Sequence, residues 1–254
     1  NQVDQSLVEE VVSLFESSSP LPILILPGNH DPYSGPDSVW DRPIFQSASA
    51  HIHVFRDVSS FALKGGHILA APLQQKVSTL DPSLALDEWV SALPEKEVKI
   101  GVTHGALAVP GKHQANDFPI ALDAASRAGL DYLALGHWHQ WQVYDDGRIV
   151  MPGTPEPDDF GQDRAGSVAL VRLGAAGESP EVEPMVVGKL RCHRMEYSLG
   201  QVEESRTRIH SLLEHVGATI EHSIVRVHLT GAVEDEVREG EKKWLSQKLA
   251  GVFA

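Results

Sequence analysis

The sequence predicts an α/β fold with a layered α+β arrangement, because segments with helical spacing alternate with short apolar runs. Apolar residues recur three or four positions apart over 6–16, which predicts a first helix. The apolar run 23–26 predicts a buried strand that ends at Pro27. A second clear strand is expected over 98–102, just before His104. Such alternation predicts a sheet that is covered by helices.

The other elements of the first 190 residues follow from the same two patterns, and the segment 145–148 (Asp-Asp-Gly-Arg) is typical of a hairpin turn. In chain order we expect strands at 52–55, 61–63 and 67–70, a helix around 86–93, a helix near 120–128, a strand at 132–135, paired strands at 142–144 and 149–151, and strands at 167–173 and 181–187.

The pattern changes near residue 190, which predicts a domain boundary. Beyond it we expect a strand, a helix over 201–216, a strand over 223–229 and a helix over 233–250. The sequence therefore predicts a main domain over 1–190 and a partial, smaller α+β domain over 191–254.

Composition limits the function classes. The 254 residues include 35 acidic and 21 basic side chains, a formal net charge of −14, which argues against DNA binding by this chain alone. One cysteine, Cys192, rules out an internal disulfide and fits a reducing compartment, so we expect a cytoplasmic protein. No apolar run approaches membrane-spanning length, so we expect no membrane partner.

Three segments carry the chemistry, and each follows a predicted strand. Gly28-Asn29-His30-Asp31 comes after the first strand, His104 after the strand over 98–102, and Gly136-His137-Trp138-His139 after the strand over 132–135. Loops at the carboxyl ends of strands can meet at one edge of a sheet. Imidazoles and an amide oxygen suit Mn²⁺, Fe²⁺ or Zn²⁺. We therefore predict that Asn29, His104, His137 and His139 bind metal.

His30 and Asp31 are candidate catalytic residues. His30 cannot easily point the same way as Asn29, so it is better placed to protonate a leaving oxygen or to stabilise charge in the transition state. Asp31 could orient its imidazole.

A structural interpretation exists for each segment alone. An Asn-His pair after a strand is often only a turn, and loop histidines often pack against aromatic side chains such as Trp138 and Trp141. The combination of three such segments, each beside a glycine, favours a metal site.

These segments resemble the third, fourth and fifth motifs of the calcineurin-like metallophosphoesterases. The segment Pro-Gly-Thr-Pro-Glu-Pro at 152–157, followed by Phe160, is similar to the same segment of the DNA repair exonuclease subunits of the SbcD/Mre11 type. The resemblance covers roughly 1–190, and the smaller α+β domain is compatible with the capping domain of that group.

The resemblance implies a metallophosphoesterase β-sandwich flanked by helices and a two-metal site. Asn29, His104 and His137 would bind one ion, His139 the other, and His30 beside Asp31 would act as the acid or transition-state residue. The implied reaction is phosphodiester hydrolysis by a metal-activated hydroxide, with Mn²⁺ as the expected ion. DNA ends, single- or double-stranded, would be the substrate, and the implied partners are an ABC-type ATPase subunit of the SbcC/Rad50 type and a second copy of the chain.

The sequence departs from the family pattern at its beginning. The family opens with Asp-x-His and then Gly-Asp, and neither occurs among these 254 residues. The four remaining ligands are neutral, whereas two dications about 4 Å apart repel by roughly 17 kcal/mol at an effective dielectric near 20. We therefore expect this chain to lack the first strand–helix–strand stretch, to bind one metal or fewer, and to be weak or inactive, with the full-length parent as the enzyme.

Two alternatives stay open. The acidic balance would suit a phosphoesterase acting on a small or lipid-linked phosphodiester. The missing motifs would instead suit a catalytically inactive interaction subunit.

Overall fold

The chain divides into two compact units, and each is described here by itself. The computed structural model describes residues 3–18, 20–36, 38–112, 114–160, 162, 165–216 and 221–253. The first unit comprises Asn1–Gly153 and Val168–Met185, and the second unit comprises Thr154–Ser167 and Val186–Ala254.

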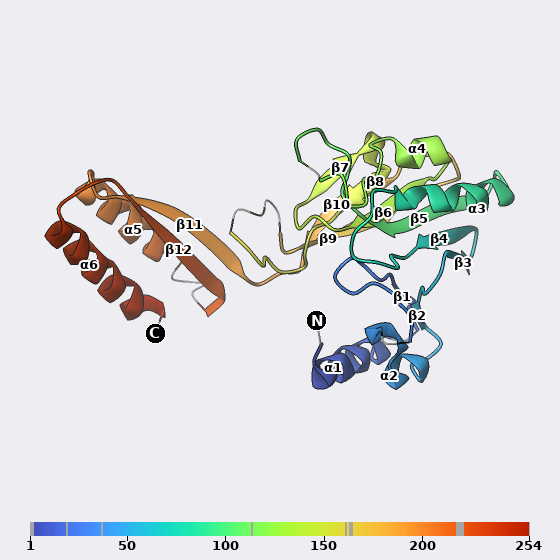
Figure 1. The fold of residues 1–254 in the computed structure, drawn as a ribbon, viewed down its shortest axis with the longest axis horizontal. Coiled ribbons are helices and arrows are strands. Elements are labelled where there is room, and N and C mark those ends of the chain that lie inside the picture. Colours follow the sequence, from blue (N-terminus) through green and yellow to red (C-terminus); the bar gives the residue numbers. More distant parts are fainter. Residues whose placement is uncertain are drawn as a thin grey trace. The chain divides into compact units, whose positions relative to one another are not determined.

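A mixed six-stranded sheet forms the centre of the first unit (Figure 1). Its strands, in spatial order, are β3 (Ser59–Leu63), β4 (Gly66–Ala71), β5 (Val98–His104), β6 (Tyr132–Gly136), β8 (Ile149–Met151) and β7 (Gln142–Tyr144). The four inner strands run parallel, and the two outer strands run antiparallel to their neighbours. The carboxyl ends of β5 and β6 therefore lie side by side, with His104 in register with Gly136.

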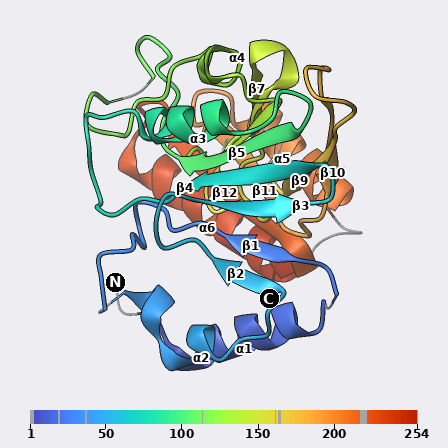
Figure 2. The same ribbon diagram turned by 90° about the vertical axis from the view of Figure 1, so that its right-hand side faces the viewer.

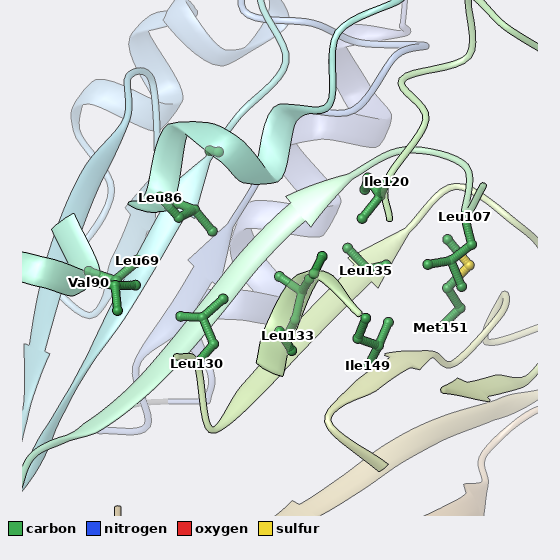
Figure 3. Packing of buried hydrophobic residues seen from close by; sticks show 13 residues of the cluster. Leu69, Leu86, Val90, Leu107, Ile120, Leu130, Leu133, Leu135, Ile149 and Met151 are labelled. Atoms are coloured by element: carbon green, nitrogen blue, oxygen red, sulfur yellow. The ribbon is translucent and has the colours of Figure 1, made fainter. Parts of the chain in front are cut away.

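Helices cover one face of this sheet, and the main hydrophobic core lies between these helices and the sheet. The helices are the 3₁₀ helix η2 (Pro82–Leu86), α3 (Asp87–Ala92) and α4 (Ala124–Ala128). Figure 3 shows Leu133 and Leu135 of β6 among the leucine and isoleucine side chains of this core. Gly101 in β5 makes the close packing possible, because a Cβ there would lie 2.8 Å from side-chain atoms of Leu130 and Leu133.

A parallel two-stranded sheet precedes the six-stranded one in the chain. It pairs β1 (Ile23–Ile25) with β2 (Ile52–Val54). Beside it lie the helices α1 (Gln5–Glu16), η1 (Val39–Asp41) and α2 (Pro43–Gln46) (Figure 2). Asp4 caps α1, since its carboxylate accepts the Ser6 N–H.

The hairpin predicted around 145–148 is confirmed. β7 pairs antiparallel with β8, and the turn between them places Asp145, Asp146 and Gly147 at positive φ. β9 (Ser167–Arg172) and β10 (Glu181–Val186) form a further two-stranded sheet where strands were expected.

The expected helix near 120–128 is wrong in its first turn. Ile120 exchanges backbone hydrogen bonds with Ala106 and Ala108 on the loop after β5, so its backbone is extended. α4 therefore begins only at Ala124 and ends at Ala128. Gly129 follows it, and its φ of 73° is the left-handed conformation that ends many helices.

The second unit contains a parallel pair of strands and two helices, in the order expected after residue 190. β11 (Arg191–Ser198) pairs with β12 (Ser223–Thr230), and α5 (Val202–Val216) and α6 (Asp235–Phe253) supply the helices. One face of the sheet packs on Ile209 and Leu245. Buried Glu241 of α6 accepts hydrogen bonds from the Tyr197 hydroxyl and the Arg206 guanidinium, which satisfies its charge.

The predicted α/β class is confirmed, because the structure has a central mixed sheet and helices that flank it. Among the described residues, no helix combines the length and the apolar character that a bilayer crossing requires.

The core of the first unit should be sensitive to truncation at Leu133. Its side chain is fully buried between α3, α4 and the sheet, so Leu133→Ala should lower the free energy of unfolding by about 2–5 kcal/mol. Leu80→Ala, at a side chain 74% exposed, is the matched control and should change it little. Urea unfolding followed by circular dichroism measures both, and equal effects would contradict the packing described here.

Candidate metal centre

Three polar side chains from separate strand ends meet at one point of the first unit. Asn29 lies on the loop after β1, His104 is the last residue of β5, and His137 follows β6 directly. Asn29 Oδ1 lies 2.9 Å from His104 Nε2, and His137 Nδ1 lies 3.3 Å from the same nitrogen. The rings of His104 and His137 meet edge to face, with centroids 5.2 Å apart. The structure therefore brings together three of the four predicted ligands.

Two glycines make room for the His104 ring. A Cβ at Gly28 would lie 2.8 Å from His104 Cε1, and a Cβ at Gly136 would lie 2.7 Å from His104 Nδ1. No real Cβ atom approaches a ring so closely, so any larger residue at either position would displace the imidazole. The glycines beside the predicted ligands thus hold His104 by close backbone contact.

His137 occupies a strained backbone conformation. Its φ is 124°, a region that residues with a side chain rarely adopt. Such strain is stored chiefly at functional sites, where the surrounding structure fixes it. In this conformation His137 Nδ1 lies 3.3 Å from His104 Nε2.

Asp117 is a site residue that the sequence did not reveal. Its Oδ2 accepts a hydrogen bond from His137 Nε2 at 2.9 Å. It lies on the long loop between β5 and α4, 20 residues from His137, and no spacing rule connects the two. The nearest sequence signal is its place in a polar stretch next to Phe118 and between two ligand-bearing strands.

The loop after β1 gives Asp31 a structural contact. Asp31 Oδ1 accepts the Gly28 N–H at 2.9 Å, and its backbone carbonyl accepts the Trp40 Nε1–H at 2.6 Å. These bonds fix the loop that carries Asn29. His30 is exposed at the surface of the same loop. The catalytic roles of His30 and Asp31 stay predictions.

His139 is exposed and lies two residues beyond His137. A positive charge on His139 or on His30 lowers the pKa of His104, so both imidazoles are close enough to His104 to interact with it electrostatically. Binding of a metal by His139 stays a prediction.

The environment of His104 keeps its imidazole neutral. Burial, followed by the charges of His137 and His30, lowers the pKa of His104 from 6.5 to about 4, although Asp117 acts in the opposite direction. A metal ligand must offer a lone pair, so a histidine that stays neutral well below pH 7 is prepared for this role.

The donor set fits one borderline divalent ion. Two imidazole nitrogens and one amide oxygen converge, and these ligand types suit Mn²⁺, Fe²⁺ and Zn²⁺. The described part of the chain holds no group of three or more histidine, cysteine, aspartate or glutamate side chains placed to share an ion. Within the described part of the chain, the three converging donors are one amide oxygen and two imidazole nitrogens, and none of these groups carries a negative charge.

Comparison with protein families settles the class of the protein. The family model of the calcineurin-like phosphoesterases matches residues 2–141, which is more than half of the chain. The chain belongs to the calcineurin-like phosphoesterase family. No curated protein matches it. Members of this metallophosphoesterase family are hydrolases that use divalent metal ions to cleave phosphoesters.

In a calcineurin-like phosphoesterase, Asn29, His104 and His137 would hold the ion. A bound divalent ion supplies Lewis acidity toward a phosphoryl oxygen and toward water. The residues of this chain supply the rest: two glycines position His104, a strained backbone aims His137, and Asp31 fixes the loop that carries Asn29. His30, on that same loop, is exposed to solvent.

The low pKa of His104 predicts a pH dependence. An unfolded histidine is protonated below about 6.5, but folded His104 only below about 4, so the unfolded chain binds more protons between these values. The free energy of unfolding should therefore fall, by up to roughly 3 kcal/mol, as the pH drops from 6.5 to 4, and should be unaffected by His104 above 6.5. His104→Gln should remove this part of the slope. NMR titration measures the midpoint directly, and a value at or above 6.5 would contradict the burial described.

Proposed function

We propose that the chain is the phosphodiesterase part of a DNA repair exonuclease of the SbcD/Mre11 type. The observation that carries the catalytic part is the convergence of Asn29 Oδ1, His104 Nε2 and His137 Nδ1 at the ends of three strands. In this proposal they bind one Mn²⁺, and His139 would contribute to a second ion only where further carboxylates supply negative charge. His30, oriented by Asp31, protonates the leaving oxygen or stabilises charge in the transition state.

The choice of the DNA branch is supported by the segment 152–157. Its glutamate, Glu156, accepts backbone hydrogen bonds from Lys189 and Leu190 at 2.8 and 2.9 Å. These bonds tie the segment to the start of β11 within the second unit. The segment that resembles the exonuclease subunits thus also has a structural role, because Glu156 holds the residues that lead into β11.

The second unit has one feature that suits a polyanion. Arg194 and Arg226 are directly opposite each other on β11 and β12, on the face away from α5 and α6. Arg226 stacks on the Phe160 ring at 4.0 Å and lies 3.5 Å from Asp159. Among the described residues, Arg194 forms no ion pair. The positive charges of Arg194 and Arg226 repel each other, and a phosphate bound between them would offset this repulsion.

Partners and conditions follow from the same proposal. The net charge of −14 means that this chain alone grips DNA weakly, so an ABC-type ATPase partner of the SbcC/Rad50 type supplies the main DNA contact. A second copy of the chain would complete a dimer. The single thiol of Cys192 suits the cytoplasm.

The metal stoichiometry and the substrate preference test this function together. After reloading with Mn²⁺, elemental analysis should give about one ion per chain, since neutral donors cannot offset the repulsion of a second. Asn29→Ala and His104→Ala should abolish retention, because each removes one of the three donors. His228→Ala, an exposed histidine of β12, is the matched control and should retain the ion.

With one ion in place of two, any cleavage by the same preparations should be weak, but it should act on end-labelled linear DNA in Mn²⁺ faster than on a closed circle and faster than on bis(p-nitrophenyl) phosphate. Hydrolysis of the small diester without cleavage of DNA would favour a phosphoesterase acting on a small or lipid-linked substrate. A bound ion with cleavage of neither substrate would favour an inactive interaction subunit. Failure to retain any Mn²⁺ would contradict the site itself.

The arginine pair gives a separate prediction. Arg194→Ala combined with Arg226→Ala should weaken binding of a labelled oligonucleotide in EDTA and reduce the slope of log K against log salt by about 2. Fluorescence anisotropy over a salt series measures both quantities. Arg208→Ala, at an exposed arginine of α5 paired with Glu204, serves as the control. An unchanged slope in the double variant would contradict the proposal that this face contacts DNA.

A further inference from the structure

One carboxylate near the metal centre does not face the point where the donors converge. Asp117 Oδ2 bonds to the Nε2 side of the His137 ring at 2.9 Å, whereas the Nδ1 side of that ring lies 3.3 Å from His104 Nε2. The side chain of His137 is 12% exposed and that of Asp117 is 28% exposed. Asp117 therefore lies behind His137 as seen from the cluster.

This position decides which ring nitrogen carries the proton. A carboxylate can only accept a hydrogen bond, so its partner, Nε2 of His137, must be the protonated nitrogen. In the neutral ring Nδ1 then keeps its lone pair, and Nδ1 is the atom that lies 3.3 Å from His104 Nε2, which in turn contacts Asn29 Oδ1. Without Asp117, either nitrogen could hold the proton, and a proton on Nδ1 would block a metal ligand.

The backbone of Asp117 is fixed on two sides, which an incidental surface contact would not require. Its carbonyl accepts the Ala106 N–H at 3.0 Å, and the next residue, Phe118, donates its N–H to Ser78 O at 2.9 Å. Phe118 is buried and adopts a φ of 52°, a conformation that costs energy for an aromatic residue.

Gly105 explains how this loop can approach β5. A Cβ at Gly105 would lie 2.4 Å from the Phe118 carbonyl oxygen, which is an impossible contact. The glycine after His104 thus admits the loop that carries Asp117. One short segment, His104-Gly105-Ala106, both supplies a donor and holds the residue that orients another donor.

We infer that Asp117 is a positioning residue of the metal centre: it sets the tautomer and orientation of His137 so that Nδ1 faces the ion. This inference rests on the proposed metal site but not on the DNA substrate. Outer partners of this kind typically change metal affinity by about 10- to 100-fold when removed.

Asp117→Asn is the sharpest variant, because it keeps the size of the side chain and can donate a hydrogen bond to Nε2. The ¹⁵N chemical shifts of the metal-free, full chain report which nitrogen of His137 is protonated. In the wild type we expect the proton on Nε2. In Asp117→Asn the amide can either accept from Nε2 or donate to it, so a detectable share of His137 should carry the proton on Nδ1, and titration calorimetry with Mn²⁺ should show about 10- to 100-fold weaker binding. Asp117→Ala should give a mixture of tautomers and an intermediate loss.

Asp123→Asn is the matched control, since it removes the same charge from an exposed residue six positions further along the chain. It should leave both the tautomer and the Mn²⁺ affinity unchanged. Thermal melting confirms that each variant is folded.

The two proposals can fail separately. A wild-type chain with the proton on Nδ1, or an Asp117→Asn chain with unchanged tautomer and affinity, overturns the role of Asp117 while DNA cleavage by the wild type would still support the proposed function. The expected tautomer change in a chain that cleaves no DNA supports the role of Asp117 and contradicts only the nuclease proposal.

Discussion

The candidate site depends on the contact between the His104 ring and the backbones of Gly28 and Gly136. Both glycines lie so close that a single added Cβ would overlap the imidazole. This contact brings the loop after β1 and the end of β6 onto the end of β5, although β1 belongs to a different sheet from β5 and β6. The positions of Asn29 and His137 follow from it, since each of these residues is the next along the chain after one of the two glycines.

The same contact determines the electrostatics of the site. Packing between two backbones removes water from His104, and this burial is the main reason why its pKa falls to about 4. The ring therefore keeps a lone pair at neutral pH. Asn29, His104 and His137 are all neutral donors, so they contribute no negative charge to balance a bound dication. An ion held there must find its compensating negative charge in other groups, such as the phosphate of a substrate.

The sequence predicted the three residues that converge at the site, but not the residue that contacts His137 from behind. Asn29, His104 and His137 were predictable because each follows an apolar strand and lies beside a glycine, and parallel strands bring their carboxyl ends to one edge. Asp117 was not predictable, since only the bridges of its loop to Ala106 and Ser78 place it behind His137. The error at Ile120 has the same origin. Its apolar spacing fits a helix, but its pairing with the loop after β5 overrides that local preference.

The loop from Gly105 to Ile120 therefore connects the stability of the core to the geometry of the site. Ile120 and Leu107 are fully buried in the core, and their bridge fixes the loop whose backbone also holds Phe118 at positive φ. Strain at Phe118 and at His137 costs of order 1–3 kcal/mol each, and burial of Ile120 and Leu107 offsets a cost of this size. A cavity at Ile120 would remove part of the packing that supports this loop, and with it part of the support of Asp117, while the donors Asn29, His104 and His137 stay unchanged.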